Sequence, residues 1–309
     1  MKKATKATAL VLATAMLTGM LAACSSTDNA GNNASAPASS EATEQTSSEA
    51  STESTPAEGG NLVFGTNAEF PPFEFVTAQG VIDQYDGIDM ALAKQIAEEN
   101  GMTAVIENME FDSLLVALQN GQIDAAIAGM TVTEERKETV DFSVPYYTAT
   151  QVMIVKEDSD IATAADMADK KICVVQGYTG EVCVKKLGDA TADVADDYKY
   201  EAFKKGTEAV MELVNGKCDV VVLDSATAAK YVSDNEGLKI VEDPSAFESE
   251  EYAIAVQKGN TELLEWINDA MVKLGSEKFF HADYDATLKE VYGDAVDPDN
   301  LVVEGGVIE

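Results

Sequence analysis

The stretch 129-GMTVTEER-136 follows an apolar run, 123-IDAAIA-128. A short run of this kind is typical of a buried parallel strand. Thr133 is suited to cap a helix, and Glu134 and Glu135 then fall in the first turn, where the helix dipole favours acids. The stretch therefore predicts a strand–turn–helix unit whose backbone N–H groups point outward at the carboxyl edge of a sheet.

Arg136 lies one turn into this predicted helix. Its planar guanidinium is suited to bind a carboxylate at two points. The unit therefore favours a site for an anionic group, and the alternative is an ordinary strand–loop–helix unit with an exposed arginine.

Strands and helices alternate on both sides of this unit. The predicted strands are 61–66, 105–107, 123–128, 150–155, 171–175, 220–223 and 251–256, and the predicted helices are 88–96, 111–118, 181 onward, 207–214 and 261–274. This order predicts an α/β protein with parallel strands and right-handed crossovers. Residues 67–75 (NAEFPPFEF) are predicted to form a loop, because Pro71 and Pro72 exclude a helix and cannot donate to a strand ladder.

An internal repeat links the two halves of the chain. The stretch 120-NGQIDAAIAG-129 matches 215-NGKCDVVVLD-224, so that Gly129 and Asp224 occupy equivalent places after an apolar strand. Two lobes of like plan would then present amide and cationic donors on one side and a carboxylate on the other. Because an unpaired buried carboxylate is costly, we expect Asp224 to contact a ligand.

The N-terminal residues predict export. Lys2, Lys3 and Lys6 precede an uncharged run, 9–23, that is too short to span a bilayer and is typical of a secretory signal. The run ends in 21-LAAC-24, which resembles the bacterial lipobox and implies lipidation of Cys24; the alternative is a plain signal peptide. Residues 25–60 hold no aromatic and no aliphatic side chain larger than alanine, so 24–60 is predicted to be a disordered tether after the 1–23 signal.

Charge and cysteine content exclude several classes of function. The net charge of −34 makes the chain a poor candidate for nucleic acid or for direct contact with anionic lipid. The spacing of Cys173, Cys183 and Cys218 matches no zinc pattern, and His281 is the single histidine. We therefore expect no metal, no cofactor and no catalytic triad. Buried free thiols are the default for Cys173 and Cys218, and the alternative is one disulfide among the three cysteines.

Several motifs together resemble the extracytoplasmic amino-acid-binding proteins of bacterial ABC importers, a solute-binding family that includes glutamine- and histidine-binding proteins. They are 65-GTNAEFPPFEF-75, 85-YDGID-89, 117-ALQNGQID-124, 129-GMTVTEER-136 and 140-VDFSVPYY-147. The resemblance implies a type II periplasmic-binding-protein fold, in which two lobes, each a mostly parallel sheet flanked by helices, are joined by two hinge strands. Lobe 1 would comprise 61–148 and 253–309, and lobe 2 would comprise 149–252.

The resemblance also implies a ligand site. Arg136 would bind the α-carboxylate of an amino acid, and Asp224 would bind its α-ammonium. The family also implies the neighbours of each part of the ligand. Thr131, Thr179 and the Gly180 backbone would lie near the carboxylate, and the Gly129 carbonyl and the Thr131 hydroxyl would lie near the ammonium. Phe70 and Phe111 would lie beside the ligand's side chain, and Asn67 and Gln176 would lie at its tip. Because two amides cannot neutralise a charge, a neutral, polar ligand is the first expectation. Glu69 leaves a cationic ligand open if it turns inward.

The implied function is capture of an amino acid outside the cell and delivery to the transmembrane subunits of an ABC permease, with no enzymatic activity. The expected protein is a monomer, held by its lipid to the outer face of the cytoplasmic membrane or in the periplasm. Two alternatives remain: a dehydratase of the cyclohexadienyl type, since relatives with this fold include such enzymes, and an extracellular amino-acid sensor.

Overall fold

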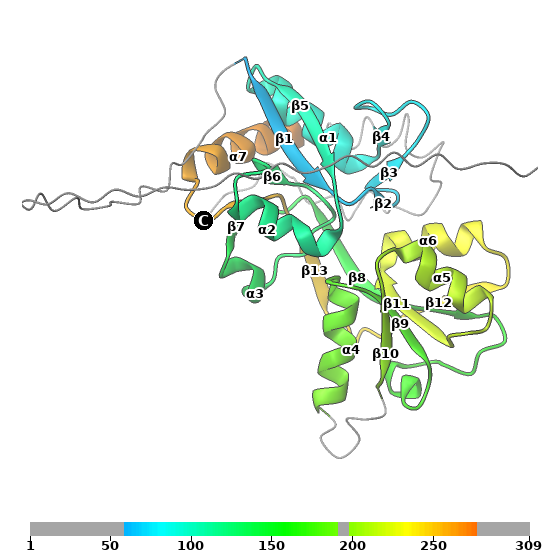
Figure 1. Ribbon diagram of the computed structural model, residues 1–309. Helices are drawn as coiled ribbons and strands as arrows, with labels where there is room; N and C mark the ends of the chain where they lie inside the picture. The colour runs from blue at the N-terminus through cyan, green and yellow to red at the C-terminus, as the bar shows by residue number, and fades with distance from the viewer. Residues whose placement is uncertain (1–58, 191–197, 277–309) are drawn as a thin grey trace, which may run out of the picture. The chain divides into compact units, whose positions relative to one another are not determined.

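The computed structural model describes residues 59–190 and 198–276 (Figure 1). The predicted signal peptide, Cys24, nearly all of the tether and His281 lie outside these ranges. No helix in the described ranges is long and apolar enough to cross a membrane.

The first sheet has five strands in the order β5-β1-β6-β14-β7. Its strands are β1 (Asn61–Thr66), β5 (Thr103–Asn108), β6 (Ala125–Ala126), β7 (Val140–Phe142) and β14 (Ala255–Gln257). The helices nearby in sequence are α1 (Ile88–Glu99), the 3₁₀ helix η1 (Phe111–Ser113), α2 (Leu114–Gln119), α3 (Glu134–Lys137) and α7 (Thr261–Ser276). Strand β1 pairs in parallel with β5 and β6, whereas β14 is antiparallel to both of its neighbours.

The second sheet has six strands, ordered β10-β9-β11-β8-β12, with β13 also paired to β8. They are β8 (Tyr147–Lys156), β9 (Ile172–Val175), β10 (Tyr200–Phe203), β11 (Val220–Asp224), β12 (Leu238–Val241) and β13 (Ser249–Tyr252). Between them run the 3₁₀ helix η2 (Ala164–Met167) and the helices α4 (Thr179–Ala190), α5 (Gly206–Val214) and α6 (Ser225–Asp234) (Figure 1). Strands β9, β10 and β11 are parallel, and β8 is antiparallel to its neighbours.

Both sheets are therefore mixed, and the α/β class predicted from the sequence is confirmed. The antiparallel members are β8, β13 and β14, together with the edge strands β7 and β12. Strands β8 and β13 pair with each other, with Tyr147 opposite Tyr252, and the lobe boundaries predicted at 148/149 and 252/253 fall on this strand pair.

The predicted loop at 67–75 is wrong. Residues Glu69–Phe70 form β2 and Glu74–Val76 form β3, which pair with β4 (Tyr85–Asp86) in a three-stranded sheet. Pro71 and Pro72 lie in the turn between β2 and β3, where no ladder donor is needed. The prolines therefore exclude a helix here without preventing the hairpin.

The internal repeat is confirmed at the level of single hydrogen bonds. The N–H of Asp124 donates to the Val63 carbonyl, and the N–H of Asp219 donates to the Lys171 carbonyl, both at 2.9 Å. A second hydrogen bond runs in the opposite direction in each copy. The N–H of Val63 donates to Asp124 Oδ2, and the N–H of Lys171 donates to Asp219 Oδ2, both at 2.8 Å. In both copies the Asn-Gly pair ends a helix, and the aspartate that follows joins the chain to a neighbouring strand through two hydrogen bonds.

The core of the first sheet contains the predicted face of α1. Ile88, Leu92 and Ile96 are 2%, 0% and 0% exposed, and burial of each such side chain contributes roughly 1.5–3 kcal/mol. Gly101 follows the helix with φ of 67°, a backbone conformation that glycine adopts without a steric penalty. These predictions rest on helical periodicity and hold because the helix packs through one face.

Candidate functional site

A pocket brings together most of the residues predicted to bind a ligand. It is lined by Phe70, Phe111, Ala128, Gly129, Thr131, Arg136, Tyr178, Thr179 and Asp224. Seven of the ten predicted ligand-binding residues are in this set. They come from β2, η1, the 127–133 connection, α3, the start of α4 and the end of β11, so the pocket draws on the elements of both sheets.

The stretch after β6 forms one wall of the pocket. Gly129 has φ of 52°, and a Cβ atom built there would lie 2.5 Å from a ring carbon of Phe70. Only glycine fits without a shift of that ring. Thr133 caps α3 as predicted, because its Oγ1 accepts from the N–H of Arg136 at 3.1 Å. The cap fixes the turn from which the Arg136 side chain starts.

Arg136 is held in place by backbone carbonyls. One terminal nitrogen donates to Thr131 O at 2.6 Å, the other donates to Gly177 O at 3.0 Å, and the guanidinium carbon lies 5.2 Å from the ring centre of Phe111. Burial lowers the pKa of Arg136, and the nearby Asp224 and Glu250 act in the opposite direction. Arginine keeps its charge in proteins, so the pocket holds a fixed cation.

Asp224 ends β11 and is 3% exposed. Its Oδ1 accepts from the hydroxyl of Tyr252 at 2.8 Å. Burial and the charge of Glu250 raise the pKa of Asp224 to about 7, and the hydrogen bond from Tyr252 lowers it. Among the described residues no ion pair within 4 Å joins Asp224 to Arg136, although both line the pocket. The pocket therefore offers two opposite charges that are not neutralised by direct contact with each other.

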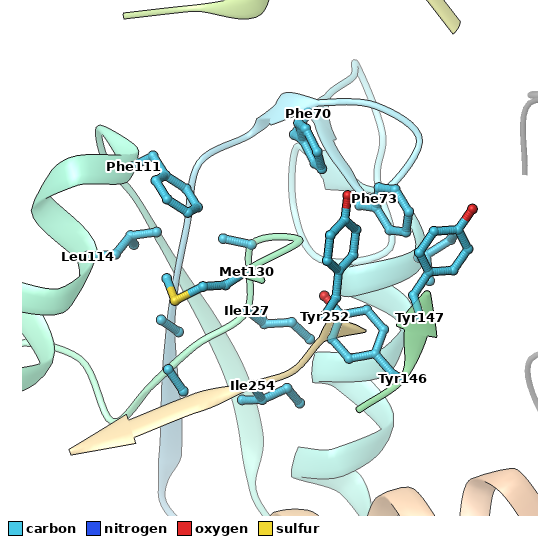
Figure 2. Packing of buried hydrophobic residues seen from close by; sticks show 14 of the residues in the cluster. Phe70, Phe73, Phe111, Leu114, Ile127, Met130, Tyr146, Tyr147, Tyr252 and Ile254 are labelled. Atoms are coloured by element: carbon cyan, nitrogen blue, oxygen red, sulfur yellow. The ribbon is translucent and has the colours of Figure 1, made fainter. Parts of the chain in front are cut away.

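Aromatic rings form the rest of the pocket wall. Tyr178 meets Phe70 edge to face at 5.4 Å between ring centres and meets Phe111 at 4.7 Å. Behind Phe70 lie Phe73 and Tyr252, which are in contact with each other at 5.2 Å and buried (Figure 2). This packing fixes the orientation of the Phe70 ring that faces the pocket.

The structure does not place Asn67, Gln176 or Gly180 in the pocket wall. Asn67 is buried, donates to Met109 O at 2.9 Å and accepts from the Tyr178 hydroxyl at 2.9 Å. Gln176 is exposed and donates to Asp112 at 2.8 Å. Both amides thus have partners in the protein.

Gly180 lies in the first turn of α4 behind Thr179, close to the Val222 carbonyl. Glu69, the acid left open for a cationic ligand, pairs with Lys205 at 2.6 Å. Cys173, Cys183 and Cys218 are free thiols, with Cys173 and Cys218 buried as predicted.

Glu250 is a residue beside the pocket that the sequence analysis missed. Its Oε2 accepts from the Thr179 hydroxyl at 2.7 Å, from the Thr131 hydroxyl at 2.9 Å and from Gln151 Nε2 at 3.2 Å. Thr131 follows β6 of the first sheet, and Thr179 begins α4, which belongs to the second sheet. The Oε2 atom of Glu250 in β13 therefore accepts hydrogen bonds from both lobes. The available signal was an acid close to the lobe boundary predicted at 252/253.

We expect Glu250→Ala to weaken ligand binding by about 1–2 kcal/mol, or about 5- to 30-fold, because the two threonine hydroxyls lose a charged acceptor that joins the lobes. Glu250→Gln keeps an acceptor oxygen and is expected to retain more affinity than Glu250→Ala. Titration calorimetry measures both, with Glu251→Ala as the matched control, because Glu251 is exposed on the same strand. A change below twofold in Glu250→Ala would contradict the linking role.

Comparison with known proteins gives consistent matches along most of the chain. The family model described as bacterial extracellular solute-binding proteins, family 3, matches residues 62–285. A probable histidine-binding protein of Neisseria gonorrhoeae is 36% identical over 213 residues, which are 68% of this chain and 76% of that protein.

Two solved structures add a likeness in three dimensions. The arginine-bound form of truncated ArgBP from T. maritima is 42% identical, with a TM-score of 0.60, and the match covers 70% of this chain and 96% of that chain. An ancestral arginine-binding protein bound to glutamine is 40% identical, with a TM-score of 0.65, and the match covers 77% and 100% of the two chains.

Proposed function

Because the chain belongs to the bacterial extracellular solute-binding proteins of family 3, we propose that its pocket captures a free amino acid outside the cytoplasm and delivers it to the permease of an ABC importer. The two-lobed, type II fold expected from the sequence is confirmed by the likeness to ArgBP. The relatives found are solute-binding transport proteins, which favours transport over the dehydratase alternative.

The observation that carries the proposal is the presence of Arg136 and Asp224 in one pocket without direct contact. An amino acid is a zwitterion, and its two charges need opposite partners when they leave water. The guanidinium of Arg136 has five N–H groups, two of which bind backbone carbonyls, and the others suit an α-carboxylate. Asp224 then binds the α-ammonium. Thr179 begins α4, a twelve-residue helix, so its first backbone N–H groups add donors for the carboxylate.

The side chain of the ligand would lie against Phe70, Phe111 and Tyr178. Because Asn67 and Gln176 have other partners, the expectation of two amides at the tip of the ligand loses its basis. Aromatic faces suit a planar polar group, such as a guanidinium, an imidazole or an amide. This class includes arginine, histidine and glutamine, which the names of the relatives mention. We therefore propose a ligand whose side chain is polar, as expected from the sequence, and also ends in a planar group.

Three finer parts of the proposal rest on the sequence. They are lipid anchoring through Cys24, a monomeric state, and lobes that divide at 148/149 and 252/253. Intact-mass measurement of the membrane-extracted protein tests the first, and light scattering tests the second.

A ligand screen tests the main proposal. At a concentration of 100 times Kd, a bound amino acid stabilises the fold by about 2.7 kcal/mol, which raises Tm by about 5–11 °C. We expect arginine, histidine or glutamine to give such a shift, and leucine and glutamate to give none. Recovery of the ligand unchanged after incubation separates binding from a dehydratase, for which prephenate and arogenate are the test substrates. Failure of all twenty amino acids to shift Tm would overturn the proposal.

A further inference from the structure

Two acidic side chains lie buried behind the pocket wall. Glu74 of β3 and Asp89 of α1 are both 0% exposed. They are neighbours, because the N–H of Asp89 donates to the carbonyl of Phe73, the residue before Glu74, at 2.9 Å. The Oδ2 atom of Asp89 also accepts from the N–H of Gly129 and from the hydroxyl of Tyr146, each at 2.8 Å. In the described part of the chain, both oxygens of Glu74 and the Oδ1 atom of Asp89 are buried without a hydrogen-bond partner, and a proton on one of the two acids would supply a donor there.

The charges around the pair offer no compensation. The groups that act on Glu74 and Asp89 from the elements packed around them are Asp224 of β11 and the phenols of Tyr146 and Tyr178. None of these is a cation, and within the described ranges neither carboxyl group forms an ion pair with lysine or arginine. Two neighbouring buried carboxylates without a counter-ion cannot both carry a charge.

The hydrogen bonds decide which group keeps the proton. Asp89 has two donors aimed at it, and each stabilises the ionised form. Glu74 has no donor, so an ionised Glu74 would be an uncompensated buried charge. Consistently, burial raises the pKa of Glu74 well above its ordinary range, while the pKa of Asp89 rises only to about 6 because Gly129 and Tyr146 lower it.

We propose that Glu74 and Asp89 share a single proton, carried by Glu74, and that the ionised Asp89 positions the Gly129 turn of the ligand pocket. Gly129 lines the pocket, and its N–H donates to the buried Asp89, so this hydrogen bond holds the turn from the side away from the pocket. Asp89 is thus a positioning residue that does not touch the ligand. The shared proton is independent of the ligand, whereas the effect on affinity rests on the proposed function.

Infrared spectroscopy tests the proton directly. Asp224 also titrates near pH 7, so the measurement is made in an Asp224→Asn background. At neutral pH we expect this background to show the carbonyl band of one protonated carboxylic acid, and the added change Glu74→Gln to remove it. Glu98→Gln, an exposed position on α1, is the matched control and is expected to keep the band. Absence of the band in the Asp224→Asn background, or its persistence after Glu74→Gln is added, would overturn the proposal.

Affinity tests the positioning role. Glu74→Leu removes the donor to Asp89, and Asp89→Leu leaves the Gly129 N–H without an acceptor, so we expect each to weaken amino-acid binding at least tenfold. Glu74→Gln supplies an amide donor in place of the acid proton and is expected to restore affinity to within about threefold of wild type. Equal binding by Glu74→Leu and Glu74→Gln would refute the role.

The comparison of the two Glu74 variants and the infrared band decide the matter even if Asp89→Leu does not fold. If the wild-type protein binds no amino acid, the proposed function fails, and the band alone still decides whether the proton is shared.

Discussion

Arg136→Ala is expected to weaken amino-acid binding by about 3–5 kcal/mol, which is more than a hundredfold in Kd. The loss is large because the α-carboxylate of the ligand would be buried without its cation. The side chain is only 9% exposed, so water does not replace it easily. Titration calorimetry on the folded variant measures the loss, and circular dichroism verifies the fold.

Two further variants make this result specific. Arg136→Lys keeps the charge but loses the planar fork that binds Thr131 O and Gly177 O, so it is expected to bind more weakly than wild type and more tightly than Arg136→Ala. Lys137→Ala, at the next position, removes an exposed cation paired with Glu134 and is expected to have almost no effect. A Kd for Arg136→Ala within threefold of wild type, about 0.65 kcal/mol, would refute the assignment.

The parts of the site that the sequence predicted well depend on short-range structure. The cap by Thr133 and the turn at Gly129 act on residues within one helical turn, so their physical cause lies in the quoted stretch itself. Asp224 could be found because the repeat aligns it with Gly129 and because a carboxylate at the end of an apolar strand needs a partner.

The surroundings of Asn67 and Gln176 could not be predicted from short-range structure. Whether an amide faces a ligand depends on which donors and acceptors other segments bring near it. Asn67 binds Met109 O and the Tyr178 hydroxyl, 42 and 111 residues away in the chain. No local pattern around Asn67 contains that information, and the motif shared with the family does not supply it either.

Pairing between distant segments explains the other differences. The β2–β3 hairpin at Glu69–Val76 depends on β4, which continues its sheet, and the chain around Pro71 and Pro72 gives no sign of that neighbour. Glu250 appears in the sequence as one more acid in an acidic chain. Its role becomes visible only when Thr131 and Thr179 meet on one of its oxygens.

Amino-acid affinity is expected to fall as the pH decreases through about 7, because Asp224 must be ionised to bind the α-ammonium. In the free protein its pKa is raised to about 7, chiefly by burial and then by Glu250, so near pH 7 about half of the molecules carry the proton. A bound ammonium favours the ionised form and expels that proton. Between pH 8 and 6 we therefore expect Kd to rise about tenfold, because the fraction of molecules with an ionised Asp224 falls from roughly nine in ten to roughly one in ten.

Calorimetry in two buffers with different ionisation enthalpies measures the released proton, which we expect to be about half a proton per ligand at pH 7.

Asp224→Asn has no proton to release. Its affinity should be more than a hundredfold lower than that of the wild-type protein and independent of pH in this range. Asp234→Asn is the control and should keep the wild-type profile, because Asp234 is exposed at the last residue of α6, the helix that begins after Asp224. Glu250→Gln should move the midpoint to lower pH, because the charge of Glu250 helps to raise the pKa of Asp224. A Kd that stays constant from pH 6 to 8 in the wild-type protein would remove Asp224 from the ammonium site.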